Sequence, residues 1–135
     1  MLKELEEIGE RRILLDSDIL IDYLRGKKEG RRFILYVLEN AKCFITSINI
    51  AEIYSGKELE DPNKEFIVSN FLNNFTLLTL DKEVSKLAGI IRRKYNLPLA
   101  DSFIAATALI YDLVLITRNI KHFSKIEGLK LLLPY

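Results

Sequence analysis

The sequence predicts a three-layer α/β/α sandwich built around a central parallel sheet of about five short strands. Three observations lead to this fold class. Short aliphatic runs alternate along the chain with longer segments that have helical spacing. The runs are almost wholly apolar, which is typical of parallel strands covered on both faces. The chain has 135 residues and no internal repeat or Gly/Ser-rich linker, so we expect a single domain over residues 1–135.

Each expected strand is an apolar run too short for a buried helix. The strands are predicted at residues 13–15, 43–45, 75–78, 114–116 and 131–133. The helices are predicted at residues 31–40, 61–74, 81–96 and 98–111. Asp61 followed by proline is a typical helix start, and Asp81 can cap the next helix.

The overall charge does not indicate a nucleic-acid-binding protein, because 20 basic and 19 acidic residues give a net charge of +1. Local basic clusters could still contact phosphates, and the candidates are Arg92, Arg93 and Arg118. Solvated helix faces explain these clusters equally well. No apolar run approaches the roughly 20 residues needed to cross a bilayer. Since the charged N-terminus also lacks the apolar part of a signal peptide, we expect a cytoplasmic protein without a membrane partner.

The sequence contains one cysteine, Cys43, and one histidine, His122. One chain can therefore form no disulfide and no zinc site of the Cys/His kind. We expect Cys43 to be a small buried hydrophobic residue. Any metal must rely mainly on oxygen ligands, which favours Mg²⁺, Mn²⁺ or Ca²⁺.

Three acids and one amide stand where an otherwise apolar stretch is interrupted or ends. Asp16 and Asn119 each follow an expected strand, whereas Glu52 and Asp101 interrupt apolar segments. Ligands of α/β folds gather at the carboxyl ends of the strands, so we expect the three acids to converge there. Converging carboxylates repel one another unless a divalent cation is bound. Such a cation can activate water for phosphodiester hydrolysis, and no Ser-His-Asp or Cys-His nucleophile is visible.

Each of these four residues also has a structural explanation. Asp16 could cap a helix that starts at the next residue, and Asp101 could favour the N-terminal end of its own helix. Glu52 could occupy an exposed helix position, and Asn119 could cap a short helix. Against this, Asp101 shares one helical face with Ala105, Ala108 and Asp112, and the alanines would let that helix approach the sheet closely.

Four segments, taken in chain order, resemble the motifs of PIN-domain ribonucleases, and in particular the VapC toxins of prokaryotic toxin–antitoxin pairs. The segments are LDSDILIDYLRG at residues 15–26, ITSINIAEIYSG at 45–56, LPLADSFIA at 97–105 and LITRNIKHF at 115–123. The resemblance covers nearly the whole chain and leaves residues 1–11 outside it as an N-terminal extension.

This resemblance implies a metal-dependent endoribonuclease in which Asp16, Glu52 and Asp101 hold Mg²⁺ or Mn²⁺. Asn119 would complete the catalytic set, and Ser47 would support the metal or its water. The family resemblance further implies an RNA substrate, a homodimer and an antitoxin protein as partner.

The chain departs from the family pattern at two places. Asn119 stands where many relatives carry Asp, so the site has one negative charge fewer. Ser17 and Asp18 replace a commoner Thr-Asn pair. We assign Ser17 to a supporting role, and Asp18 is an extra acid without an assigned role.

The sequence leaves two competing functions open. The opening run also resembles haloacid-dehalogenase phosphatases, in which Asp16 would be a covalent nucleophile. That family needs a later acidic pair after glycine, and the chain contains no Gly-Asp dipeptide. The other alternative is a catalytically inactive PIN-fold module that binds a protein. The presence of all three acids argues against this alternative.

The helices at 61–74 and 81–96 carry more large apolar side chains than one core-facing stripe can hold. Some of them should therefore pack against a second copy of the chain. The side chains concerned are Phe66, Ile67, Phe71, Leu72, Leu87, Ile90, Ile91 and Tyr95. The alternatives are that these side chains cover an antitoxin-binding surface, or that they fit beneath neighbouring helices in a monomer.

Overall fold

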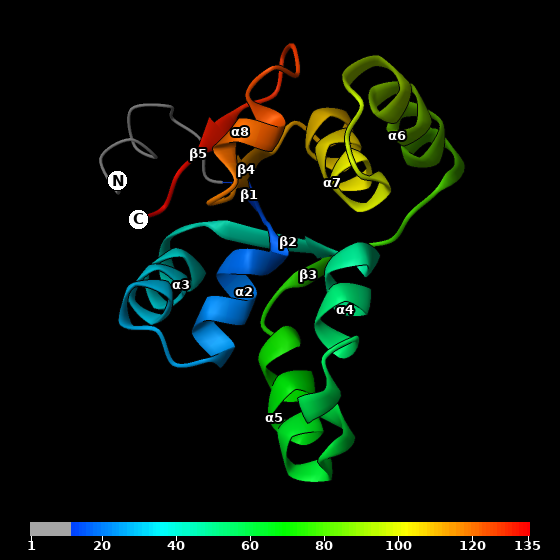
Figure 1. Ribbon diagram of the computed structural model, residues 1–135. Coiled ribbons are helices and arrows are strands. Elements are labelled where there is room, and N and C mark those ends of the chain that lie inside the picture. Colours follow the sequence, from blue (N-terminus) through cyan, green and yellow to red (C-terminus); the bar gives the residue numbers. More distant parts are fainter. Residues whose placement is uncertain (1–11) are drawn as a thin grey trace.

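The computed structural model describes residues 12–135 and contains a five-stranded parallel sheet (Figure 1). The proposed extension at residues 1–11 lies outside the described residues. The strand order is β3-β2-β1-β4-β5, and every neighbouring pair is parallel. The strands are β1 (Arg12–Leu15), β2 (Lys42–Thr46), β3 (Thr76–Leu78), β4 (Val114–Ile116) and β5 (Leu131–Leu132). The predicted fold class and all five strand positions are confirmed.

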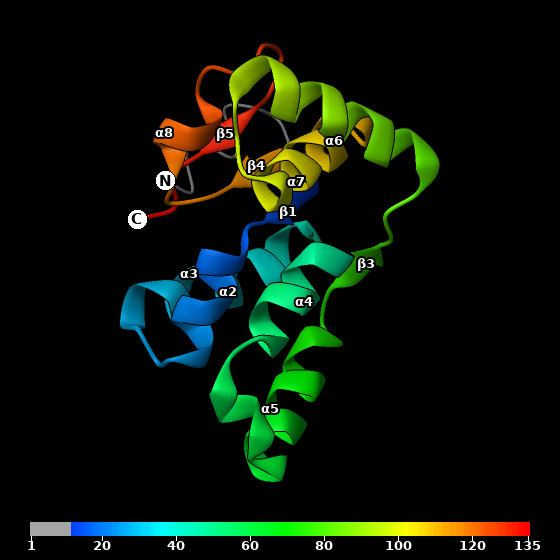
Figure 2. The ribbon, with the colours of Figure 1, turned by 45° about the vertical axis from the view of Figure 1, so that its right-hand side comes forward.

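Helices cover both faces of this sheet (Figures 1 and 2). They are α2 (Ser17–Leu24), α3 (Lys28–Asn40), α4 (Ser47–Tyr54), α5 (Pro62–Leu72), α6 (Lys82–Tyr95), α7 (Leu99–Ile110) and α8 (Ile120–Phe123), with a 3₁₀ turn at Lys57–Glu60. Across residues 12–135, none of these helices is long and apolar enough to cross a membrane.

Alternate side chains of β1 enter two different hydrophobic cores. Ile13 and Leu15 pack in a core with residues of α2, α3 and α5. Leu14 packs on the other face of the sheet, with residues of α6, α7 and α8. This arrangement explains the continuous apolar runs of β1, β2 and β4, because both faces of these central strands are buried. The edge strand β3 is more exposed, and 44% of the Leu77 surface is accessible.

Local sequence signals set several helix ends as expected. The Asp81 side chain accepts a hydrogen bond from the Val84 N–H at 2.8 Å, which caps α6. Asn96, in the left-handed conformation with φ of 55°, ends the same helix. The Asp61 side chain caps α5 by accepting a hydrogen bond from the Asn63 N–H at 2.9 Å. Cys43 is buried, as predicted, and burial raises the pKa of its thiol to about 12.

The helical face predicted to carry Asp101, the two alanines and Asp112 is confirmed only in part. Ala105 and Ala108 are buried between this helix and the sheet side of the molecule. The placement of Asp112 on this helical face is wrong. Helix α7 ends at Ile110, and Asp112 follows it with φ of 54° and an ion pair to Lys130.

The order of the strands creates a switch point between β1 and β4. From β1 the chain moves outward through β2 and β3, and it then returns to the other side of β1 as β4. The carboxyl ends of β1 and β4 therefore lie side by side, and the Asp16 N–H donates to the Ile116 carbonyl oxygen at 2.9 Å. In α/β folds this is the place at which ligands bind.

A buried acid, Asp22, ties the segment after β4 to helix α2. Its carboxylate accepts hydrogen bonds from the Arg118 guanidinium at 2.9 Å and from the Tyr135 hydroxyl at 2.7 Å. Lys27 adds an ion pair at 3.3 Å. Burial alone would raise the pKa of Asp22, but the hydrogen bonds from Tyr135, Lys27 and Arg118 outweigh it and lower the pKa.

We predict that Asp22→Asn lowers the free energy of unfolding by roughly 2 kcal/mol, because it removes charge-assisted hydrogen bonds in a buried position. Urea denaturation at pH 7 measures this change. A lowered folded-state pKa means that the stabilisation is complete above the unfolded-state pKa and is lost as the pH falls through the folded-state value. The difference between the two proteins should therefore shrink in acid.

The matched control for this experiment is Asp112→Asn, because the side chain of Asp112 is 75% exposed and its ion pair faces solvent. The control should change the free energy of unfolding by less than about 0.5 kcal/mol. Equal effects of the two substitutions would contradict a structural role for the Asp22 contacts.

Candidate active site

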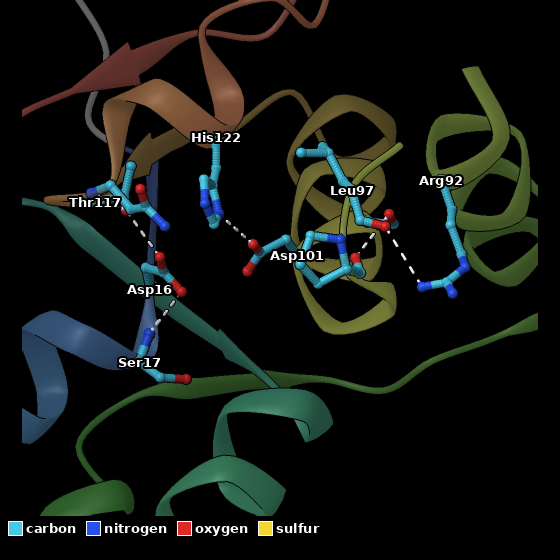
Figure 3. Close-up of polar contacts among 10 residues, drawn as sticks. Asp16, Ser17, Arg92, Leu97, Asp101, Thr117 and His122 are labelled. Carbon is cyan, nitrogen blue, oxygen red and sulfur yellow. Dashed lines mark hydrogen bonds and ion pairs between the residues drawn. The ribbon is translucent and has the colours of Figure 1, made fainter. Parts of the chain in front are cut away.

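Asp16 lies at the switch point, directly after β1, and only 8% of its surface is exposed. Its Oδ1 accepts a hydrogen bond from the Ser17 N–H at 2.8 Å, which caps α2. Its Oδ2 accepts one from the Thr117 hydroxyl at 2.8 Å (Figure 3). Thr117 follows β4, so the two strands that border the switch point meet at this carboxylate. Asp16 therefore caps α2, as one of its structural explanations predicted, and its carboxylate still lies at the switch point.

The surroundings of Asp16 disfavour its negative charge. Burial, followed by the charge of Asp18, raises the pKa of Asp16 to about 7, and the charge of Asp101 contributes in the same direction. The hydrogen bonds from Thr117 and Ser17 act in the opposite direction without cancelling this effect. The site is therefore a place where a cation is favoured.

Asp101 lies in the first turn of α7 and faces the same region as Asp16. Its Oδ2 is 2.8 Å from Nδ1 of His122, which belongs to α8. Figure 3 shows the carboxylate directed from α7 toward the side on which Asp16 lies. Two of the three predicted acids are thus brought together across the switch point.

Glu52 is joined to this region through Ser17. The Ser17 hydroxyl donates to Oε1 of Glu52 at 2.6 Å and accepts from the Asn49 amide at 2.8 Å. The Oδ1 of Asn49 in turn accepts from the backbone N–H of Thr46 at 2.7 Å, as part of a capping box at the start of α4. Ser17 therefore connects the end of β1 with the helix that follows β2, which fits the supporting role predicted for it.

The other predicted polar residues contribute less in this structure. The Asn119 N–H donates to the Thr117 hydroxyl oxygen at 2.9 Å, and Asn119 precedes α8 without a side-chain capping bond. Ser47 begins α4, which Thr46 caps. Within residues 12–135 the side chains of Ser47 and Asn119 form no hydrogen bond, and their roles at the site stay predictions.

The three basic residues suggested for RNA binding lie in different surroundings. Arg118 is engaged by Asp22, and its guanidinium lies 5.3 Å from the centre of the Tyr135 ring. Arg92 donates to the Leu97 carbonyl oxygen at 3.4 Å and lies on α6, beyond α7 as seen from Asp16 (Figure 3). Arg93 is exposed on the same helix. RNA contacts by these residues stay predictions, and Arg118 is the least available of the three.

The predicted cluster of three acids is not assembled around one point. Over residues 12–135, no group of three or more His, Cys, Asp or Glu side chains is arranged so that it could hold a metal ion. The donors nevertheless suit a hard cation, since Mg²⁺ commonly takes one or two carboxylates and keeps several waters. In addition, Oδ1 of Asp18 is buried and accepts no hydrogen bond from the described residues. Asp16 and Asp101 thus fit as direct ligands, with Glu52 within the same network.

Three positioning residues escaped the sequence analysis: Asn49, Thr117 and His122. Asn49 carries a local signal, because Thr46 and Asn49 have the spacing of a capping box. Thr117 and His122 contact acids far away in the sequence, 101 and 21 residues distant. Only their position just after the apolar run at residues 114–116 could have indicated them.

Comparisons with known proteins agree on one family. The family model described as PIN domain matches residues 13–129. The chain is 32% identical over 123 residues to ribonuclease VapC10 of Mycobacterium tuberculosis, covering 87% of this chain and 90% of the relative. It is 29% identical to ribonuclease VapC1 of Methanocaldococcus jannaschii, covering 96% and 93%.

Two solved structures contain chains with the same fold as this chain. The structure is similar to a chain in a toxin–antitoxin complex from Klebsiella pneumoniae, with a TM-score of 0.77, 30% identity and coverage of 91% of this chain and 98% of that chain. A chain in DNA-bound VapBC from Salmonella typhimurium has a TM-score of 0.77 at 24% identity, with coverage of 90% and 96%.

We predict that Asp16→Asn stabilises the metal-free protein at pH 8, raising the melting temperature in EDTA by roughly 5 °C. A carboxyl group whose folded-state pKa is raised to about 7 costs stability as the pH rises from the unfolded value of 3.8 toward 7. Asparagine retains the capping ability and carries no charge. The advantage of the variant should be smaller at pH 5, and a wild-type protein more stable than the variant at pH 8 would contradict the prediction.

Proposed function

Since this chain belongs to the PIN-domain family, we propose that it is a divalent-metal-dependent endoribonuclease and the toxin of a toxin–antitoxin pair. One observation supports the proposal most strongly: the buried Asp16 lies at the switch point of the sheet, and its pKa is raised to about 7 by burial and by the charges of Asp18 and Asp101. The relatives that are named ribonucleases support RNA as the substrate. An RNA substrate is consistent with action in the cytoplasm.

The proposed roles follow from the contacts. Asp16 and Asp101 would hold Mg²⁺ or Mn²⁺, and Glu52 would act from its position beside Ser17. A cation bound there would activate a water molecule and offset the negative charge that develops on the phosphate. Thr117 fixes one oxygen of Asp16, and the backbone after β1 fixes the other. Asn119 would support the site without adding charge.

The alternative functions receive less support. A nucleophilic Asp16, as in a haloacid-dehalogenase phosphatase, would need a later acidic pair after glycine, and the chain contains no Gly-Asp dipeptide. In an inactive protein-binding module, we would not expect an acid such as Asp16, whose burial lowers the stability of the fold.

An open groove beside Glu52 is the surface that we propose for the antitoxin. It has a volume of about 720 Å³ and lies among α2, α4 and α5. Its apolar lining residues include Ile21, Leu24, Ile53 and Val68, with Ile67 also in the wall and 61% exposed. Charged residues line it as well, among them Arg25 and Lys64. An amphipathic segment could bury the apolar side chains and reach Glu52, which also lines the groove.

We also propose that the chain forms a homodimer. The sequence indicated an excess of large apolar groups on two helices, and the structure leaves Phe66 on α5 67% exposed and Ile90 on α6 45% exposed. Gly89, which precedes Ile90 in α6, also lies at the surface, because a Cβ added there would meet no atom within 4 Å.

We predict that the purified protein cleaves single-stranded RNA in the presence of Mg²⁺ or Mn²⁺ and shows no cleavage in EDTA. Asp16→Asn and Asp101→Asn should each reduce the cleavage rate by at least about 100-fold, because they remove direct ligands. Asp112→Asn, an exposed acid at the end of α7, is the control and should cleave at the wild-type rate. Cleavage that persists in excess chelator, at equal rates in all four proteins, would overturn the metal-dependent mechanism.

For the groove, we predict that Ile67→Glu weakens binding of the protein encoded by the adjacent reading frame by at least about 10-fold, since one fully buried anchor can contribute 2 kcal/mol or more. Co-purification and titration calorimetry measure this. Leu35→Glu is the matched control, because Leu35 is 56% exposed on α3 and does not line the groove. Equal binding by the two variants would place the partner elsewhere.

For assembly, we predict a dimer mass by light scattering at micromolar concentration, and a shift toward monomer in Ile90→Glu. The substitution places a charge in an apolar contact that would be buried between copies. A clean monomer mass for the wild-type protein would refute the dimer.

A further inference from the structure

We propose that His122 is a positioning residue of the metal site, which holds Asp101 so that its free carboxylate oxygen is presented toward Asp16. This inference rests on the proposed function, and it assigns a role to the single histidine of the chain. His122 would not touch RNA or the reacting atoms. It would act through Asp101.

The contact itself has the geometry of a directed hydrogen bond. Nδ1 of His122 lies 2.8 Å from Oδ2 of Asp101, and the two side chains are 46% and 20% exposed. An ionised carboxylate can only accept, so Nδ1 carries the hydrogen and donates. This leaves Oδ1 of Asp101 without a hydrogen bond among residues 12–135 and available to a cation or its water.

One short segment fixes both acids. Thr117 at its start donates to Asp16 at 2.8 Å, and His122 at its end contacts Asp101. The segment is held internally by the bond from the Asn119 N–H to the Thr117 hydroxyl, at 2.9 Å. Phe123, the next residue, is fully buried and anchors α8 against the α7 side of the sheet.

The consequence is that the relative placement of the two carboxylates depends on residues 117–122. Asp16 comes from the end of β1 and Asp101 from the start of α7, and these elements carry no direct hydrogen bond between the two side chains (Figure 3). Hydrogen-bonded partners of metal-ligating groups commonly contribute about 10–100-fold to metal affinity. His122 is placed to make such a contribution.

The test uses Mn²⁺ binding, measured by titration calorimetry on the full chain. We expect His122→Ala to weaken Mn²⁺ binding by about 10-fold. His122→Asn should bind nearly as well as wild type, because its amide nitrogen can take the place of Nδ1. His122→Gln should resemble alanine, because its amide reaches the position of Nε2 instead. Ser124→Ala, an exposed residue just after α8, is the control and should bind as wild type does.

RNA cleavage gives a second readout that a merely structural role would not move. In His122→Ala the rate at low Mn²⁺ should fall, and saturating Mn²⁺ should restore most of it, with KM for RNA unchanged. Equal Mn²⁺ affinity of wild type and His122→Ala would overturn the inference while the proposed function stands. A wild-type protein that binds Mn²⁺ but cuts no RNA would overturn the function, and the affinities would still decide the role of His122. A wild-type protein that binds no Mn²⁺ would overturn both.

Discussion

The hydrogen bond from the Thr117 hydroxyl to Asp16 is the contact on which the rest of the site depends. It joins the carboxyl ends of β1 and β4, which border the switch point of the sheet. The backbone bond between Asp16 and Ile116 holds the same two segments at 2.9 Å. Because the strands are buried on both faces, their ends are fixed by the two cores, and Asp16 has little freedom to move away from its charged neighbours. A buried acid in a fixed position is thus a direct product of the strand order.

That fixed acid makes the region a compromise between stability and function. Burial and the charges of Asp18 and Asp101 oppose the ionised form of Asp16, and natural proteins accept such costs at functional sites. Around it, neutral or basic partners orient each acid: Ser17 contacts Glu52, and His122 contacts Asp101. These hydrogen bonds hold the acids in place. A divalent cation is the group that would complete this arrangement, and the all-oxygen donors suit it.

The sequence predicted the strands well, because runs buried on both faces must be apolar and are easy to recognise. It also predicted helix starts at Asp61 and Asp81, where capping is a local interaction. The site was predicted only in part. The charge of Asp101 acts on Asp16, whereas the side chain of Glu52 accepts a hydrogen bond from Ser17, a contact set by Asn49 in the first turn of α4. Thr117 and His122 were missed because their partners are distant in sequence, and only the strand order brings them together.

We propose that the switch point between β1 and β4 is a divalent-cation site formed by Asp16 and Asp101. Anomalous diffraction from crystals grown with Mn²⁺ tests it most directly. We expect one strong anomalous peak within ligand distance of a carboxylate oxygen of each of these residues, and we expect that peak to be lost in Asp101→Asn crystals. Fully occupied Mn²⁺ bound elsewhere, or no peak at this position at saturating Mn²⁺, would show that these two acids do not form a cation site.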